Sequence, residues 1–500
     1  MLRCLSMKEL RRILLASAAV VCACGVCGCA VGPNFKRPAP PSAAYAAPPP
    51  AVGDQHTVYG GEIAADWYSL FKSEALNRLV QDALQANPDL EAARHNLNAA
   101  QFELRAVAGA ALPHMELDAR AQRGKVNGSL LYEPPQALQV TANQFSLGPS
   151  LAYDLDVFGR LRRTIEAQAA QTSGVQRQAL NVYVTLIDQV VITAFSYAAT
   201  FEQVQVTRKL VEDLQAQYDL TQLLENSGKV VRSETLQAQT QLENTRAGLP
   251  ALEKQLDVYR NTLCRLTGKP PQPDSIPALA LRDFTLPRQL PVSLPSNLVR
   301  QRPDILEAED LLHQASAAIG VAEATRLPSI SLSAQYAQQS IQTTDLFSKP
   351  GQIWSAGVNL TAPLFEGGTL RAREKEARER FLQADAQYRS TVIEAFVEVA
   401  NALQALQHDA DDYSAHTIAL NAAQANRDLA RTQFERGRVS ELIVLTAEQQ
   451  FQNAVLGQVQ ADAQRFADVA ELFRALGGGW WNGADPATLP AARTNSTEGQ

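Results

Sequence analysis

Two long stretches without proline limit what this chain can fold into. Gly159 and Gly228 are 69 positions apart, as are Gly368 and Gly437, and no proline lies in either interval. A continuous helix over such an interval would be ~100 Å long, because an α-helix rises 1.5 Å per residue. Apolar residues recur there in steps of four and three, at Val392, Phe396, Val399, Leu403 and Leu406. This spacing is typical of coiled coils and predicts rods that pack on other helices.

The chain also contains an internal duplication. Residues 87–90 (NPDL) recur 215 positions later as 302–305 (RPDI), whereas Gly159 and Gly228 recur 209 positions later as Gly368 and Gly437. A repeat of about 200 residues is too long for a solenoid and indicates duplication of a whole domain. Each copy is predicted to contain a helix after its Pro-Asp, two strands, and two long helices joined at the second glycine.

The strand pair is predicted from strict alternation of apolar and polar residues. In the first copy, Met115, Leu117 and Ala119 alternate with Glu116 and Asp118, and in the second copy residues 329–336 and 354–361 alternate in the same way. Strands of ~10 residues with one apolar and one polar face suit a membrane barrel with a wet interior. A half-buried sheet of a soluble protein shows the same alternation.

Composition and motifs argue against several classes of function. The 500 residues carry 45 basic and 52 acidic side chains, a net charge of −7, without a basic block. A nucleic-acid binder usually has a clustered positive face, so nucleic acid is not an expected partner. Beyond the first thirty residues no stretch approaches the ~20 apolar residues of a helical membrane span, which argues against a polytopic helical transporter. The sequence shows no nucleophile elbow, phosphate loop or HExxH pattern, and we predict no enzymatic activity.

The N-terminus is typical of a bacterial lipoprotein. Residues 1–28 have basic residues followed by an apolar run, as in a secretory signal. The sequence ending at Cys29 (VCGC) resembles a lipobox, which implies cleavage before Cys29 and attachment of diacylglycerol and an N-acyl chain to it. Position 30 is Ala rather than the Asp of lipoproteins kept at the inner membrane, so this resemblance implies the outer membrane. Only Cys264 remains in the body of the chain, which excludes a disulfide framework there.

A single copy of such a chain cannot complete a membrane barrel. Four strands are predicted per chain, whereas single-chain barrels start at eight, and an open sheet edge in lipid leaves backbone groups without hydrogen bonds. The chain is therefore expected to oligomerise. Two copies would give eight strands with a filled interior, and three would give twelve strands with an open lumen.

Five motifs in order carry a resemblance that spans nearly the whole chain. They are CAVGPNFKRP from Cys29, YDLDVFGRLRR from Tyr153, LPSNLVRQRPDILEAE from Leu294, APLFEGG from Ala362 and ALGGGW from Ala475. Together they resemble the TolC-like outer-membrane factors, specifically the NodT-type lipoproteins. The resemblance implies an α+β, mostly α fold in a homotrimer, with a twelve-stranded outer-membrane β-barrel and a periplasmic α-barrel. It also implies a periplasmic adaptor and an inner-membrane efflux pump, commonly proton-driven, as partners.

The turns between the long helices are the predicted adaptor-docking residues. They are Gly228, Lys229, Val230, Gly437, Arg438 and Val439. The same glycines are also expected simply because a tight turn between helices needs positive φ. Both interpretations can hold together.

The resemblance also implies gate residues beside these turns. In the family an acidic residue after the first turn bonds a Tyr and an Arg beside the second turn. Glu234 matches the acid, but Phe434 lacks the Tyr hydroxyl and Val439 occupies the Arg position. Arg436 or Arg438 would have to replace that arginine. A cation-binding ring of aspartates is not supported, and Glu441 is a weak replacement candidate.

One more cluster suits a metal. His408, Asp412 and His416 are four apart and share a helical face. They lie off the apolar heptad positions, so a solvated outer face is the alternative, and we predict neither a metal nor another cofactor beyond the lipid.

The main hypothesis is the exit duct of a tripartite efflux system. The alternatives are the duct of a type I protein secretion system and a non-pore periplasmic coiled-coil lipoprotein. The predicted divisions are a signal peptide (1–28), a lipidated irregular segment (29–75), repeat 1 (76–268), a linker (269–297), repeat 2 (298–477) and a tail (478–500). The sequence does not name the cargo.

Overall fold

The computed structural model describes residues 30–39, 51–52, 54–127, 139–272 and 274–483. The expected signal peptide and Cys29 lie outside the described residues, as does the tail after residue 483. The chain divides into two compact units. The first contains the described residues up to Arg37 together with Asn98–Gly174 and Ala308–Tyr388, and the second contains the remainder. The unit boundaries fall inside four helices, and the units are described separately below.

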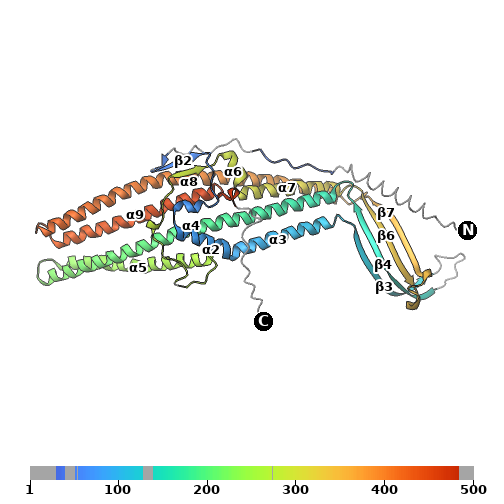
Figure 1. The fold of residues 1–500 in the computed structure, drawn as a ribbon, viewed down its shortest axis with the longest axis horizontal. Coiled ribbons are helices and arrows are strands. Elements are labelled where there is room, and N and C mark those ends of the chain that lie inside the picture. The colour runs from blue at the N-terminus through green and yellow to red at the C-terminus, as the bar shows by residue number, and fades with distance from the viewer. Residues whose placement is uncertain (1–29, 40–50, 53, 128–138, 273, 484–500) are drawn as a thin grey trace. The chain divides into compact units, whose positions relative to one another are not determined.

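The helices and strands follow the predicted order in both copies (Figure 1). In the first copy they are α2 (Glu74–Ala86), α3 (Pro88–Gly109), β3 (His114–Asn127), β4 (Gln139–Leu155), α4 (Arg160–Asn226) and α5 (Arg232–Leu266). In the second copy they are α6 (Pro295–Gln301), α7 (Pro303–Ala324), β6 (Ser329–Ser340), β7 (Gln352–Thr361), α8 (Thr369–Glu435) and α9 (Glu441–Ala475). The two rods have 67 residues each and their return helices 35 each, so the duplication extends to element lengths.

Two predicted boundaries are wrong by a few residues. Each copy begins with an extra helix, α2 or α6, and the expected starts at residues 76 and 298 fall inside these helices. Ser73 caps α2 by accepting a hydrogen bond from the backbone N–H of Leu76, and Pro295 occupies the first turn of α6. Both caps lie a few residues before the expected starts.

The segments expected to be an irregular N-terminus and a linker instead form part of a sheet. The strands β1 (Ala51–Val52), β2 (Gln55–Tyr59) and β5 (Gln289–Val292) form a sheet in the order β1-β2-β5, and β2 and β5 pair in parallel. Leu290 is fully buried, and the side chain of Gln55 donates a hydrogen bond to the carbonyl of Pro287. Because β5 is an edge strand of this sheet, it tolerates Pro291.

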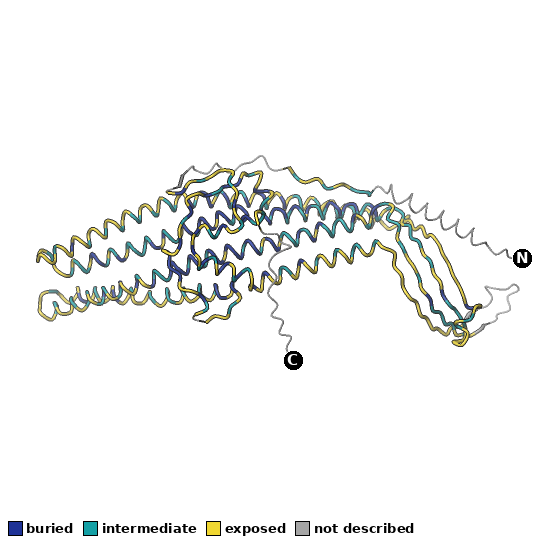
Figure 2. Tube along the Cα trace, in the orientation of Figure 1, coloured by how far each residue is buried: buried dark blue, intermediate teal, exposed yellow. Residues whose placement is uncertain are grey.

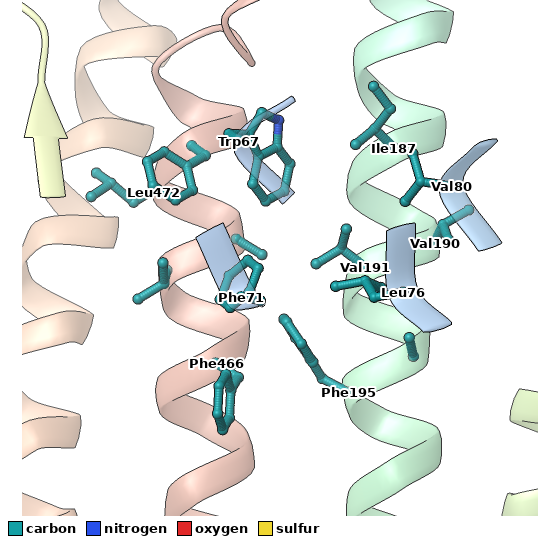
Figure 3. Close-up of a cluster of buried hydrophobic side chains, with 14 of the residues drawn as sticks. Trp67, Phe71, Leu76, Val80, Ile187, Val190, Val191, Phe195, Phe466 and Leu472 are labelled. Carbon is teal, nitrogen blue, oxygen red and sulfur yellow. The ribbon is translucent and has the colours of Figure 1, made fainter. Parts of the chain in front are cut away.

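The second unit has the larger apolar core. Aromatic rings from three distant parts of the chain meet there: Phe71 of η1 (Trp67–Phe71), Phe195 of α4 and Phe466 of α9 (Figure 3). Phe71 and Phe195 are 4.8 Å apart between ring centroids, in an edge-to-face arrangement that stabilises aromatic pairs. An 18-residue window of α4 is apolar enough to cross a membrane, but most of it is buried in the fold, as in a core helix.

Candidate channel wall, helix tips and N-terminal strap

The first unit contains a four-stranded antiparallel sheet in the order β3-β4-β6-β7. Its register places side chains of like polarity on the same face across all four strands. Met115 faces Leu151, which faces Ala334, which faces Ala356. The larger apolar side chains on this face include Met115, Leu117, Phe145, Leu147, Leu151, Tyr153, Leu155, Ile330, Leu332, Tyr336, Trp354, Val358 and Leu360.

The opposite face is polar. Glu116 faces Ser150, which faces Gln335, which faces Ser355. Across the strands Ser150 donates a hydrogen bond of 2.7 Å to Asp118. On the apolar face, Trp354 is 76% exposed and Met115 74% exposed within the single chain. The outer strands β3 and β7, which carry these two residues, are largely exposed (Figure 2). A soluble sheet would bury its apolar face, so this arrangement is that of a barrel wall facing lipid on one side and water on the other.

The two outer strands of this sheet, β3 and β7, have no strand beyond them in the described chain. Each therefore presents a row of backbone N–H and C=O groups without strand partners. In lipid such an edge costs several kcal/mol per unsatisfied group, by order of magnitude. The sheet is complete only when further strands pair with both edges.

The residues after Cys29 form an N-terminal strap, Val31–Arg37, on the first unit. The Val31 N–H donates to the Phe158 carbonyl at 3.1 Å, just after β4. Arg163 of α4, almost fully buried, donates to the carbonyls of Val31 and Gly32 and to the Asn34 side chain. The strap thus follows α4 from the end of the sheet.

Further along, the strap contacts α7. The Phe35 ring stacks on His313 with centroids 4.4 Å apart. Glu166 joins the two helices, because it accepts a hydrogen bond from Arg163 and lies 2.9 Å from Nε2 of His313. Burial alone would raise the pKa of Glu166, but the hydrogen bonds from His313 and Arg163 lower it below its ordinary value.

The helix tips are the turns at the end of each rod: the first tip is residues 227–231 and the second tip residues 436–440. Gly228 has φ +73° and Gly437 +65°, so both adopt the left-handed conformation that closes a helix. The N–H of Lys229 bonds the Leu224 carbonyl at 2.9 Å, and the N–H of Arg438 bonds the Gln433 carbonyl at 2.9 Å. The turn interpretation of both glycines is therefore confirmed.

Each tip exposes a basic residue followed by a half-buried valine, Lys229-Val230 and Arg438-Val439. Apolar side chains surround them in the single chain: Leu223, Val231, Phe434 and Ile443 are between 43% and 65% exposed. Phe434 is also one of the gate candidates predicted from the sequence. Exposed apolar residues with basic neighbours are typical of protein-binding surfaces.

The gate residues are not joined within the described chain. Glu234, Arg436, Arg438 and Glu441 are all exposed, and no hydrogen bond or ion pair links Glu234 to either arginine. The structure instead shows a contact that the sequence did not reveal. Arg431 of α8 lies 2.8 Å from the nearly buried carboxylate of Glu448 of α9 and fastens the second hairpin near its tip. The only hint of this contact in the sequence is that Arg431 and Glu448 lie on either side of Gly437.

The histidine cluster does not form a metal site in the described residues. Nε2 of His416 lies 3.7 Å from the Asp412 carboxylate, and no group of three or more His, Cys, Asp or Glu side chains there could hold a metal ion.

These features define a class of protein in which a sheet that forms part of a membrane barrel is followed in the chain by long helical hairpins. A family model described as outer membrane efflux protein matches residues 79–269 and 294–478, more than half of the chain. The chain belongs to the outer membrane efflux protein family. The two matched segments correspond to the two copies of the duplication.

Similar proteins agree with this assignment. The cation efflux system protein CusC of Escherichia coli O6:H1 is 29% identical over 91% of this chain and 96% of its own length. The probable efflux pump outer membrane protein TtgC of Pseudomonas putida KT2440 is 28% identical over 93% of this chain and 96% of its own length. The probable outer membrane lipoprotein SilC of Salmonella typhimurium is 28% identical over 83% of this chain and 88% of its own length.

Solved structures share the fold. The outer-membrane channel OprN superposes with a TM-score of 0.80 at 27% identity, over 90% of this chain and all of that one. The open-state channel MtrE of Neisseria gonorrhoeae superposes with a TM-score of 0.78 at 25% identity, over 90% of this chain and 98% of that one. The predictions of family, fold class, efflux function and location are therefore confirmed. The protein is an outer-membrane channel of efflux systems that extends into the periplasm, and its family consists of transporters.

Proposed function

We propose that three copies of this chain close one channel. The observation that carries the proposal is the four-stranded sheet with an apolar face, a polar face and two unpaired edges. Three such sheets would supply twelve strands, enough for an open lumen lined by the polar face, whereas two would supply eight and a filled interior. The chain itself has no enzymatic role in this proposal.

The helix tips would dock the periplasmic adaptor, which links the channel to an inner-membrane pump, commonly a proton-driven one. Support comes from the exposed basic and apolar residues on both tips, which repeat the Gly-basic-Val sequence. Acidic residues on an adaptor would complement Lys229 and Arg438. The double substitution Lys229→Glu with Arg438→Glu should abolish efflux and leave the trimer intact.

Cys29 would carry diacylglycerol and an N-acyl chain as the only covalent group. The strap supports this proposal, because Val31, two residues later, is hydrogen bonded beside the end of β4. A lipid on Cys29 would then be attached two residues before this hydrogen-bonded position. Two or more acyl chains give stable membrane anchoring, which one chain does not.

The test is a deletion strain complemented with wild type, with Cys29→Ala and with the tip double variant. Susceptibility to dyes, antibiotics, detergents and divalent metals is measured, and the purified protein is examined for a heat-modifiable trimer and single-channel conductance. Wild type should restore resistance to one class of compound and conduct ions as a trimer. A monomer without conductance would refute the channel proposal, and an unaltered efflux phenotype of the tip variant would refute docking at the tips.

A further inference from the structure

The sheet β3-β4-β6-β7, here called the wall sheet, has a helix end and a hairpin end. Short connections join all four strands to helices at the same end: α3 leads into β3, β4 into α4, α7 into β6 and β7 into α8. The opposite end carries the connections within the β3–β4 and β6–β7 hairpins. Because the chain extends into the periplasm through its long helices, the hairpin end of the wall sheet lies at the outer leaflet of the outer membrane.

The apolar face of the wall sheet is a band whose height matches a bilayer. On β4 the band extends from Phe145 to Leu155, ten residues further along the strand. At 3.3 Å per residue this is ~33 Å along the strand, or ~25 Å along the membrane normal for the tilt of about 40° that membrane strands adopt. Membrane barrels have an apolar band of about 25 Å. The two ends of the band therefore lie at the two membrane surfaces.

Aromatic side chains mark the hairpin end of this band. Ala121 of β3 faces Phe145 of β4, and Tyr336 of β6 faces Trp354 of β7. These four residues are the last apolar positions on this face of the strands before the hairpin connections. Aromatic girdles are typical of the interfaces between a membrane and water. The positions that follow on the same face therefore lie among the headgroups of the outer leaflet.

Two basic side chains occupy these positions on β3. Arg123 and Lys125 continue the face of Met115, two and four residues beyond Ala121, and both are exposed. Each step of two residues is ~7 Å along the strand and ~5 Å along the membrane normal. The other strand positions beyond the band on this face are uncharged: Asn127, Gln139, Thr141, Asn143, Gln338, Ser340 and Gln352. On this face of the described strands, no carboxylate neutralises the two cations at this level.

The duplication shows that the strand fold does not require this basic pair. At the repeat offset of 215, the counterpart of Arg123 is Gln338 and the counterpart of Lys125 is Ser340. Both copies change from apolar to polar residues at the same position of the strand, but only the first copy places positive charge there. The charge therefore suggests a ligand rather than a need of the sheet.

We propose that Arg123 and Lys125 bind the phosphate groups of lipopolysaccharide. This glycolipid forms the outer leaflet of the outer membrane, and its lipid A part carries phosphates on the sugars above the acyl chains. The guanidinium of Arg123 can accept a phosphate in a fork of two hydrogen bonds, and Lys125 adds a second positive charge. The acyl chains of the same molecule would lie along the apolar band. This site requires only that the wall sheet faces lipid, so it does not depend on how many copies close the channel.

Lipid binding to the purified full-length protein tests this site. Native mass spectrometry measures the bound fraction of lipid A at increasing lipid concentration, and lipid A without its phosphates is the second probe. Arg123→Gln with Lys125→Ser introduces the residues of the second copy. This double variant should weaken binding of phosphorylated lipid A about 25-fold, because a basic residue near an anionic membrane surface contributes about 1 kcal/mol, or about fivefold. Arg120→Gln, on the opposite face of the same strand, is the matched control and should bind lipid A as wild type does.

Two further measurements identify the chemistry of the site. The dephosphorylated lipid should bind to wild type and to the double variant with equal affinity. Exchanging the two side chains, in Arg123→Lys with Lys125→Arg, keeps both charges and should retain most of the affinity for phosphorylated lipid A. Excess inorganic phosphate should not displace the lipid, since it lacks acyl chains for the apolar band.

The opposite results would overturn the proposal. They are equal binding of phosphorylated lipid A to wild type and to the neutral double variant, an equal loss of binding in Arg120→Gln, and full displacement by inorganic phosphate. Single-channel conductance of the same preparations reports on the channel itself. A protein that conducts but does not distinguish the two lipids would therefore refute the lipid site and leave the channel proposal intact.

Discussion

Arg302 donates a hydrogen bond of 2.8 Å from Nη1 to the backbone carbonyl of Ala475, which ties the start of α7 to the end of α9. In the first copy Asn87 occupies the same position and donates to the Leu266 carbonyl at 2.9 Å, at the end of α5. The duplication has kept this connection while changing the side chain that makes it. In the second copy Arg302 also binds the carboxylates of Asp304 and Glu398.

Removing the Arg302 side chain should destabilise the second unit. Arg302→Ala leaves Glu398 without its nearest cation and the Ala475 carbonyl without a donor, and breaking a buried ion pair costs about 3–5 kcal/mol. Thermal unfolding of the full chain in detergent measures the effect. Arg300→Ala, at an exposed position of α6, is the matched control. Equal melting temperatures for the two variants would contradict the prediction.

Asp188 should make stability depend on pH. Burial raises its pKa to about 7, against the attraction of Arg474. The folded protein holds the Asp188 proton more tightly than the unfolded chain does. The contribution of this proton to the free energy of unfolding is therefore fully present at low pH and is lost as the pH rises from about 4 to 7. Asp188→Asn should flatten this dependence and raise stability at pH 8 by at most about 4 kcal/mol. Lower stability of Asp188→Asn at pH 8 would show that the pair with Arg474 outweighs burial.

Arg163 should hold the N-terminal strap in place. Arg163→Ala removes donors to two strap carbonyls and to Asn34, and hydrogen bonds of a charged group contribute about 1.5–3 kcal/mol. Proteases should then cleave the strap faster in folded protein. Arg163→Lys should restore only part of the protection, since lysine lacks the planar fork of donors. Cleavage at the wild-type rate in Arg163→Ala would rule out this role, and Arg160→Ala is the control.

Glu234 should restrict the aperture, as the family resemblance implies. Glu234→Ala is expected to admit large antibiotics through the channel, and susceptibility of cells carrying the variant measures this leak. Glu441→Ala, a charge deletion beside the other tip, serves as the comparison. Wild-type susceptibility in cells with Glu234→Ala would sink the hypothesis. The Glu234 carboxylate has no hydrogen-bond or ion-pair partner within the described chain, so such a lock would need a residue of another copy.

A few local sequence patterns predicted most of the long elements of this fold. The absence of proline after Gly159 and Gly368 predicted both rods to within a few residues, and the alternation around Met115 predicted the faces of the wall sheet. The parallel pairing of β2 with β5 was missed, because two short strands far apart in sequence carry no periodic signal.

Side-chain partners were harder to predict than elements. The Arg431–Glu448 pair and the Arg163 contacts depend on which helix faces meet, and the sequence alone does not specify that. The glycines of the tips were predictable because positive φ is a local requirement. The docking and gating roles of the neighbouring residues concern other molecules and stay predictions.

A wall sheet with two open edges also has a consequence for biogenesis. If three copies close the sheet as proposed, a lone protomer would leave the backbone groups of its outer strands without partners in the bilayer. Membrane insertion would then wait for encounters between copies and would slow steeply as the protein is diluted. Confinement to a membrane surface raises the frequency of such encounters. In the proposed trimer, the timing of channel formation would be governed by how many newly secreted chains reach the same patch of membrane.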